Sequence, residues 1–364
     1  MMWSIVKDEW RSVWRDEGVV LIVVFALFIY GISYSLGYGG EVLNEVPIAV
    51  VGCEQSAKSR ELVRMFDASP KLRVECEAAD MTEAERLLRE RKVWGVVALS
   101  PNFERDILSC RQARVAILGD ASYFLAYREV AEGAVATIQQ MNKQIALERD
   151  GEYNPPIIYE QRNLFNPSLG YGIFVMPAII LLIVQQTALI GVGMVSATRR
   201  ERRLRYGSHS AFAITIGRTV VYLVIYALTL GFMLTVHYLL FDYPMRGAWW
   251  RCVAVVVPYL LAVIFLAQAL GALFRRRESS IVWLLWLSIP FLLVSGVSLP
   301  PQAFPQWLYI IGKAVPSSSA VDAWIAVQSR GATLSDIIPN LTLLWCLVVL
   351  YGAGAVVANR SLRQ

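Results

Sequence analysis

Charged residues are scarce in this chain. They make up only 17% of its 364 residues, whereas 56% are hydrophobic and the mean hydropathy is positive. Soluble domains carry a charged share of about 25%, so the composition excludes an ordinary soluble globular protein. The excess of apolar residues indicates that lipid surrounds much of the chain.

Metal-binding and catalytic motifs are also missing. The sequence has only two histidines, His209 and His237, and its five cysteines lack the close paired spacing of zinc sites: Cys53, Cys76, Cys110, Cys252 and Cys346. The hydrolase motifs GxSxG and HExxH are absent, and so is the GxxxxGK loop that cradles nucleotide phosphates. We therefore expect no metal site, no bound cofactor and no enzymatic activity in this polypeptide.

Six apolar segments are long enough to cross a bilayer, since a helical span takes about 20 residues. They are residues 18–36, 169–197, 213–241, 252–274, 281–299 and 337–358. Residues 1–17 precede them and carry an amphipathic pattern, which predicts a helix lying on the membrane surface, with this apolar stripe: Trp3, Val6, Trp10, Val13 and Trp14. A cleaved signal peptide is the competing interpretation; the mixed charges and the lack of a small-residue cleavage site favour an uncleaved span.

Basic residues of the short loops predict the orientation, because they concentrate on the cytoplasmic side. They precede the first span, follow the second and fourth spans, and end the chain: Lys7, Arg11, Arg15, Arg199, Arg200, Arg202, Arg203, Arg205, Arg275, Arg276, Arg277, Arg360 and Arg363. We expect a multi-pass protein of the bacterial inner membrane with both termini in the cytoplasm.

Residues 37–168 then lie outside the cytoplasm. Apolar runs at 46–51, 72–74, 93–99 and 115–118 alternate with helical patterns, which predicts a small α/β domain. After Asp120 a longer helix carries a stripe that packs either in its own domain or against a partner: Tyr123, Tyr127, Val130, Ala134, Met141 and Ile145. An oxidising compartment would allow a disulfide between Cys53 and Cys76, but three cysteines leave the pairing open. The expected fold is an α-helical polytopic membrane protein with six transmembrane helices and an inserted extracytoplasmic α/β domain.

Two segments carry more distinctive motifs. RNLFNPSLGYGIFVMPAIILLIVQQTALIGVGMVSATRRERR, residues 162–203, has an Asn-Pro pair at 166–167, a proline near the start of the second span at Pro177, and an Arg-Glu-Arg cluster at 200–202. SGVSLPPQAFPQWLYIIGKAVPSSSAVDAWIAVQSRGATLSDI, residues 295–337, has a proline-bounded start and a second proline at Pro316. Both segments resemble the type-2 ABC transporter permease family, in which the second forms an external hairpin between spans five and six.

The resemblance implies the permease subunit of an ABC exporter, which moves a substrate out of the cytoplasm or inner membrane while a separate ATPase subunit uses ATP and Mg²⁺. It implies a second permease copy or a paralogue, and it extends to a periplasmic adaptor and an outer-membrane channel; no nucleic acid is expected. The competing hypothesis is a non-transport envelope protein whose external domain binds a ligand or partner. Association with an ATPase distinguishes the two. Neither the substrate nor the choice between homodimer and heterodimer can be read from the sequence.

Three groups of candidate site residues follow within the membrane domain, residues 169–364. The basic loop 198–210 is expected to couple to the ATPase, although the same arginines also suit a plain topogenic loop: Arg199, Arg200, Glu201, Arg202 and Arg203. Prolines in the hairpin 300–336 indicate an external gate or, alternatively, a surface loop: Pro300, Pro301, Phe304, Pro305 and Trp307. Four polar residues of the spans face a transport pathway or link helices: Gln185, Gln186, Gln268 and His237.

Overall fold

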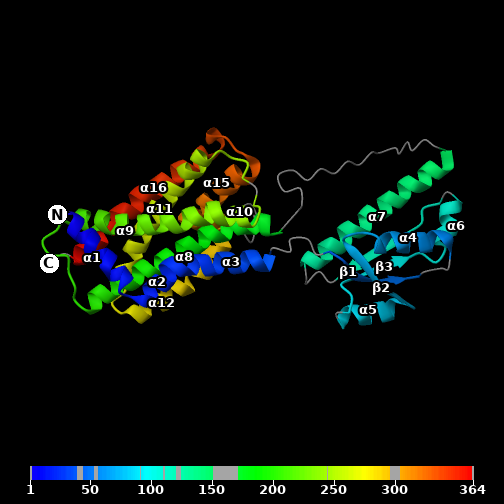
Figure 1. The fold of residues 1–364 in the computed structure, drawn as a ribbon, viewed down its shortest axis with the longest axis horizontal. Helices are drawn as coiled ribbons and strands as arrows, with labels where there is room; N and C mark the ends of the chain where they lie inside the picture. The colour runs from blue at the N-terminus through cyan, green and yellow to red at the C-terminus, as the bar shows by residue number, and fades with distance from the viewer. Residues whose placement is uncertain are drawn as a thin grey trace. The chain divides into compact units, whose positions relative to one another are not determined.

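The computed structural model describes residues 2–38, 44–52, 56–90, 92–109, 111–119, 124–150, 171–243, 245–295 and 304–362. The chain divides into two compact units, one formed by residues 1–39 with 163–364 and the other by residues 40–162. The first is a bundle of helices and the second is a sheet with helices packed on it (Figure 1).

Six helical stretches of the first unit are long and apolar enough to cross a membrane: Glu17–Gly37, Val175–Glu201, Ala211–Leu240, Trp249–Gly271, Arg277–Val294 and Leu334–Leu362. They confirm the six predicted spans. Their elements are α2 (Glu17–Val20), η1 (Leu21–Phe25) and α3 (Ala26–Tyr38); α8 (Tyr171–Glu201); α9 (Ala211–Phe232), η2 (Met233–His237) and α10 (Tyr238–Leu240); α11 (Trp249–Gly271); α12 (Arg277–Trp286) and α13 (Ser288–Val294); α16 (Leu334–Asn359) and η4 (Arg360–Leu362).

Helix α8 lies at the centre of the bundle and packs against α3, α11 and α12. Two of its glycines allow this close approach, because a Cβ added at Gly191 would lie 2.1 Å from Val23 and one added at Gly193 would lie 2.5 Å from Leu284. Small residues at such contacts let membrane helices pack closely. Spans one and five therefore hold α8 from two sides.

The N-terminal helix α1 (Met2–Trp14) packs on the bundle through Ile5, Glu9 and Val13, which are buried. These residues follow one another at four-residue spacing and so lie on one helix face. The predicted stripe is mostly a different face, since Trp3 is 76% exposed and Trp10 and Trp14 are also exposed. Of that stripe, only Val13 is fully buried.

Two short helices precede the last span, namely α14 (Gln306–Lys313) and α15 (Pro316–Arg330). Helix α15 packs against α8, α11 and α16, and Trp324 and Val327 are fully buried in the core of the bundle. Gly331 ends α15 in the left-handed conformation at φ 66°, which glycine adopts without steric cost. Residues 316–330 are thus part of the bundle core and not a surface loop.

The second unit contains β1 (Val46–Val51), α4 (Ala57–Asp67), β2 (Leu72–Ala78), α5 (Met81–Arg89), β3 (Gly95–Leu99), α6 (Phe103–Leu108), β4 (Val115–Gly119) and α7 (Phe124–Asp150). The strand order is β2-β1-β3-β4, with β1 parallel to β2 and β3, and with β4 antiparallel to β3. Apolar residues of α4, α6 and α7 form one core with the sheet, and those of α5 form another. The predicted α/β organisation is present.

The stripe of the long helix α7 packs within its own unit. Val130, Ala134 and Met141 are buried in the core shared with α4, and Ile145 packs against that core. Tyr127 is more exposed, and Tyr123 lies outside the described residues. Cys53 and Cys110 lie outside the described residues too, so the disulfide between Cys53 and Cys76 stays a prediction.

Candidate functional site

A buried carboxylate lies where α1 meets the bundle. The Glu9 side chain is fully buried, and its Oε1 accepts hydrogen bonds from Arg218 Nε and from the Tyr222 hydroxyl, both at 2.9 Å. Its Oε2 forms an ion pair with Arg199 Nε at 3.2 Å and accepts a hydrogen bond from the Tyr206 hydroxyl. Glu9 therefore joins α1 to α8, to α9 and to the segment between them.

Arg218 extends this contact across the bundle. Its Nη1 donates to Asn359 Oδ1 at 2.9 Å and its Nη2 donates to Ser196 Oγ at 2.7 Å. The Asn359 amide donates to Gln268 Oε1 at 2.8 Å, and the Gln268 amide donates to Thr219 at 2.9 Å. One hydrogen-bonded network, which we call the Glu9 network, thus links α1, α8, α9, α11 and α16.

The Glu9 carboxyl stays ionised in this environment. Burial alone would raise its pKa, but the attraction of Arg218 and then of Arg199 outweighs burial and lowers the pKa from 4.5 to about 2. Burial, followed by the nearby Glu9 charge, raises the pKa of the Tyr206 hydroxyl well above 10.0. At neutral pH a carboxylate therefore faces two arginines and a neutral phenol.

The segment 202–210 between α8 and α9 is held against α1. The Arg199 guanidinium lies 4.2 Å from the centre of the Tyr206 ring, and His209 Nε2 lies 3.3 Å from Ser4 Oγ on α1. The Tyr206 backbone N–H donates to the Leu362 carbonyl at 3.1 Å. The segment, α1 and the end of the last span therefore pack together around Glu9.

The predicted coupling residues are divided by the structure. Helix α8 continues to Glu201, so the connecting segment begins only at Arg202. Arg199 points inward to Glu9, while Arg200 donates to the carbonyls of Gly271 and Phe274. Glu201, Arg202 and Arg203 are exposed. The three exposed residues can contact a partner protein, whereas Arg199 and Arg200 contact other helices of the bundle.

A groove of about 700 Å³ lies beside the Glu9 network, between α1, the end of α8 and the start of α12. Its lining includes three carboxylates, Asp8, Asp16 and Glu17, and six arginines: Arg11, Arg15, Arg199, Arg202, Arg205 and Arg277. Asp16 is already bound to Arg277, with Nη2 and Oδ1 2.7 Å apart, and Asp8 to Arg199 at 3.0 Å. The groove is therefore positively charged.

The polar residues predicted to face a pathway make contacts between helices. Gln185 Oε1 accepts a hydrogen bond from the Ser317 backbone N–H at 3.0 Å, in the first turn of α15. Gln186 donates to the Leu284 carbonyl, and His237 lies 2.8 Å from Ser35. Such links are common in membrane bundles. A pathway role for Gln185, Gln186 and Gln268 stays a prediction.

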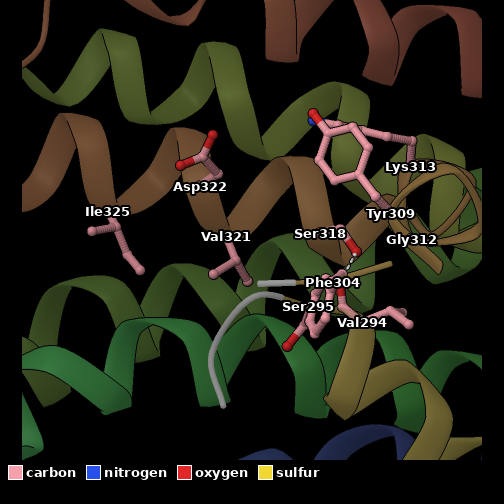
Figure 2. A pocket seen from close by; sticks show the side chains of 10 residues that line it. All are labelled: Val294, Ser295, Phe304, Tyr309, Gly312, Lys313, Ser318, Val321, Asp322 and Ile325. Carbon is pink, nitrogen blue, oxygen red and sulfur yellow. Dashed lines mark hydrogen bonds between the residues drawn. The ribbon is translucent and has the colours of Figure 1, made fainter. Parts of the chain in front are cut away.

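A second cavity, of about 100 Å³, lies between α13, α14 and α15, and Figure 2 shows the side chains around it. Phe304 lines it, as do Tyr309 and Lys313, whose ammonium lies 5.2 Å from the Tyr309 ring centre. Ser318 Oγ donates to the Val294 carbonyl at 3.0 Å (Figure 2). The cavity joins the end of span five to the two short helices.

The other predicted gate residues do not line this cavity. Pro305 precedes the first residue of α14, and Trp307 on α14 is 63% exposed. Pro300 and Pro301 lie outside the described residues. Of the gate residues whose positions the structure describes, only Phe304 meets the cavity, and the gate stays a prediction.

The central residues of the Glu9 network were missed from the sequence, although signals for them exist. Arg218 is the only charged residue in the apolar span 211–240, and a charge inside a span is a functional hypothesis by default. Glu9 falls midway between Ile5 and Val13 on one helix face. No cluster of three or more potential metal ligands occurs among the residues that the structure describes.

Comparisons with known proteins give the family of the chain. Residues 18–357 match the family model described as ABC-2 family transporter protein. The chain is 26% identical over 349 residues to the inner membrane transport permease YhhJ of Escherichia coli (strain K12) and of Shigella flexneri, covering 92% of this chain and 91% of YhhJ. It is 20% identical over 367 residues to the probable multidrug ABC transporter permease YbhR of Escherichia coli (strain K12), covering 100% and 98%. The chain therefore belongs to the ABC-2 family of transporter proteins and is the membrane permease subunit of an ABC transporter.

Proposed function

We propose that this permease exports its substrate, and that its ATPase subunit binds the end of the bundle formed by α1, the last turn of α8 and the segment 202–210. The observation that carries the proposal is the arginine-lined groove beside the Glu9 network. ATP and Mg²⁺ are used by the ATPase, and this chain binds no cofactor. That end of the bundle faces the cytoplasm, so both termini lie inside the cell and residues 37–168 lie in the periplasm.

The charges of the groove support this docking surface. Among the described residues, Arg11, Arg15 and Arg202 take part in no ion pair, and all three are exposed. An ATPase surface with acidic side chains would therefore find unpaired partners there, which favours rapid and correctly oriented association. The docked subunit would touch the short connection between spans two and three directly.

Two spans leave most of their apolar surface exposed, and a second permease copy would pack against these spans. In each of the spans Arg277–Val294 and Leu334–Leu362, only 17% of the most apolar 18-residue stretch is buried against other parts of the chain. Lipid or a second permease copy, identical or paralogous, would cover the rest. The route for the substrate would then lie between two bundles, with a periplasmic adaptor and an outer-membrane channel extending it. Because YbhR is a probable multidrug permease, hydrophobic drugs are the first substrates to test for efflux.

Purification of the native complex through a tag on this chain tests the proposal. We expect an ATPase to copurify, and we expect the double variant Glu201→Lys/Arg202→Glu to lose both copurification and stimulation of ATP hydrolysis. Glu85→Lys/Arg89→Glu is the matched control, because it reverses the charges of an exposed glutamate and an exposed arginine of the other unit. Copurification of no ATPase with the unaltered chain would refute the function. Equal behaviour of the double variant and the control would refute the docking surface.

Thiol labelling of intact cells tests the orientation. In a chain whose five native cysteines are replaced by serine, a cysteine introduced at Arg89 on α5 should react with a membrane-impermeant maleimide, and a cysteine introduced at Arg202 should react only after the cells are opened. Both side chains are exposed, so access to the compartment decides the reaction. The reverse pattern would place residues 37–168 in the cytoplasm.

A further inference from the structure

The contact between α1 and the spans contains two fully buried charges of opposite sign. Glu9 and Arg218 are both 0% exposed, and they lie 209 residues apart in the chain. Removing two ions from water is costly, and their attraction compensates only when the geometry is good and the remaining polar atoms find partners. Here every polar atom of both side chains has a partner: Arg199, Tyr206 and Tyr222 for Glu9, and Asn359 and Ser196 for Arg218.

This geometry points to a mechanical role. A buried, fully paired ion pair cannot be separated without leaving charges without partners, which adds a penalty for sliding to that of the apolar packing. Ile5, one turn before Glu9, adds a close steric contact, since a Cβ on Gly217 of α9 would lie 2.8 Å from it. A displacement of α1 must therefore carry α9 with it, and α16 through Asn359.

A second tie fixes the start of span one to a different span. Asp16, between α1 and α2, pairs with Arg277 at the start of α12, and both side chains are partly exposed. The attachment of α1 to α9 is thus buried and multivalent, whereas the attachment to α12 involves one solvent-accessible pair. Solvent-accessible pairs are weaker than buried networks. Motion of α1 is delivered mainly to α8 through Arg199, to α9 through Arg218 and to α16 through Asn359.

We propose that Glu9 is a positioning residue that transmits movement of the docked ATPase from α1 to spans two, three and six. The proposal rests on the proposed function, because it presumes an ATPase bound to α1 and the segment 202–210. It adds the specific side chain through which the movement passes. Glu9 touches neither nucleotide nor substrate in this scheme.

The test uses the full complex with its ATPase in lipid nanodiscs, with spin labels at Leu228 on α9 and Val253 on α11, both exposed. In the unaltered chain, ATP with Mg²⁺ and vanadate should change the distance between the labels. Glu9→Gln removes the charge and keeps the side-chain size, so the ATPase should still bind and hydrolyse ATP while the change in distance is lost. Glu278→Gln, an exposed carboxylate of α12 outside the network, should respond like the unaltered chain.

A second variant separates transmission from folding. Glu9→Met/Arg218→Met removes both charges, so neither is left without its partner, and Arg199 keeps its ion pair with Asp8. This variant should fold where Glu9→Gln fails to fold. It should also bind the ATPase and lose the change in label distance. An unaltered response in either folded variant would overturn the proposal and leave the proposed function standing. Absence of ATPase binding in the unaltered chain would instead refute the proposed function.

Discussion

The contact between Ile5 and Gly217 offers a sharp test of how α1 is attached. A Cβ built on Gly217 would lie 2.8 Å from Ile5 Cγ2 and 3.0 Å from Ile5 Cβ. Real Cβ atoms do not approach other atoms so closely, and Ile5 has no room to turn because its χ1 angle is restricted by β-branching. Gly217→Ala must therefore push α1 away from α9.

The magnitude follows from two opposing effects. Extra methyl groups in a packed core cost about 1–3 kcal/mol. Replacement of glycine by alanine inside a helix, in contrast, gains up to about 1 kcal/mol. Gly231→Ala on the same helix isolates the second effect, because a Cβ there meets no atom within 4 Å. We expect Gly217→Ala to be about 1–3 kcal/mol less stable than Gly231→Ala.

The assay is thermal unfolding of the purified chain in detergent, together with proteolysis of α1. Gly217→Ala should unfold at a lower temperature than Gly231→Ala and should expose α1 to protease. In an Ile5→Ala background the 2.8 Å contact with Cγ2 is removed and the 3.0 Å contact with Cβ remains, so the difference between the two glycine variants should shrink. Equal unfolding temperatures in the native background, or an undiminished difference in the Ile5→Ala background, would refute the contact.

Of four further predictions, three concern charges and one concerns the start of a helix. Arg218→Met should lower the free energy of unfolding by about 3–5 kcal/mol because Glu9 is left without its main partner, and Glu9→Met/Arg218→Met should recover part of it in thermal melts, since no carboxylate is then left without Arg218. Since the pKa of Glu9 falls from 4.5 unfolded to about 2 folded, its stabilisation is full above about pH 5 and is lost as the pH falls toward 2. The melting temperatures of the unaltered chain and Glu9→Gln should therefore converge on acidification; a constant gap would contradict the pKa. Lys71→Met should loosen α7 by about 1–2 kcal/mol in hydrogen exchange, because Lys71 pairs with Glu129, which is 7% exposed, and unchanged exchange would contradict the pair. Gln185→Ala should cost about 1 kcal/mol in thermal melts through the lost bond to the start of α15; equal unfolding of Gln185→Ala and the unaltered chain would contradict this bond.

The sequence indicates which residues belong to the coupling region, but not which contacts two of them make. Arg199 and Arg200 were expected to meet the ATPase together with Glu201, and helical periodicity explains why they do not share one environment. Successive residues of α8 point in different directions, so Arg199 faces α1 while Arg200 faces the end of α11. The loop pattern of the sequence ends the helix too early, because arginines extend a helix as readily as they fill a loop.

The six spans could be predicted from the sequence because membrane insertion depends on hydropathy within about 20 consecutive residues, which is a local property. The family could be predicted because the motifs of residues 162–203 and 295–337 resemble it. The strands and helices of the small α/β unit could be predicted for the same reason as the spans, since the pattern of each lies within one short segment. The face of α1 that packs on the bundle was not predictable in this way. Its tryptophans form the more conspicuous apolar stripe, yet Ile5, Glu9 and Val13 are the residues that pack.

Only the tertiary structure decided which charges meet. Glu9 and Arg218 are 209 positions apart, and α1, α8, α9 and α16 must pack together before the two side chains share a site. The energy of that contact depends on burial and on the partners that the other helices supply, and no local pattern encodes either. The sequence by itself therefore determined the spans and the family, whereas the packing of the spans created the buried network on which our proposal for coupling depends.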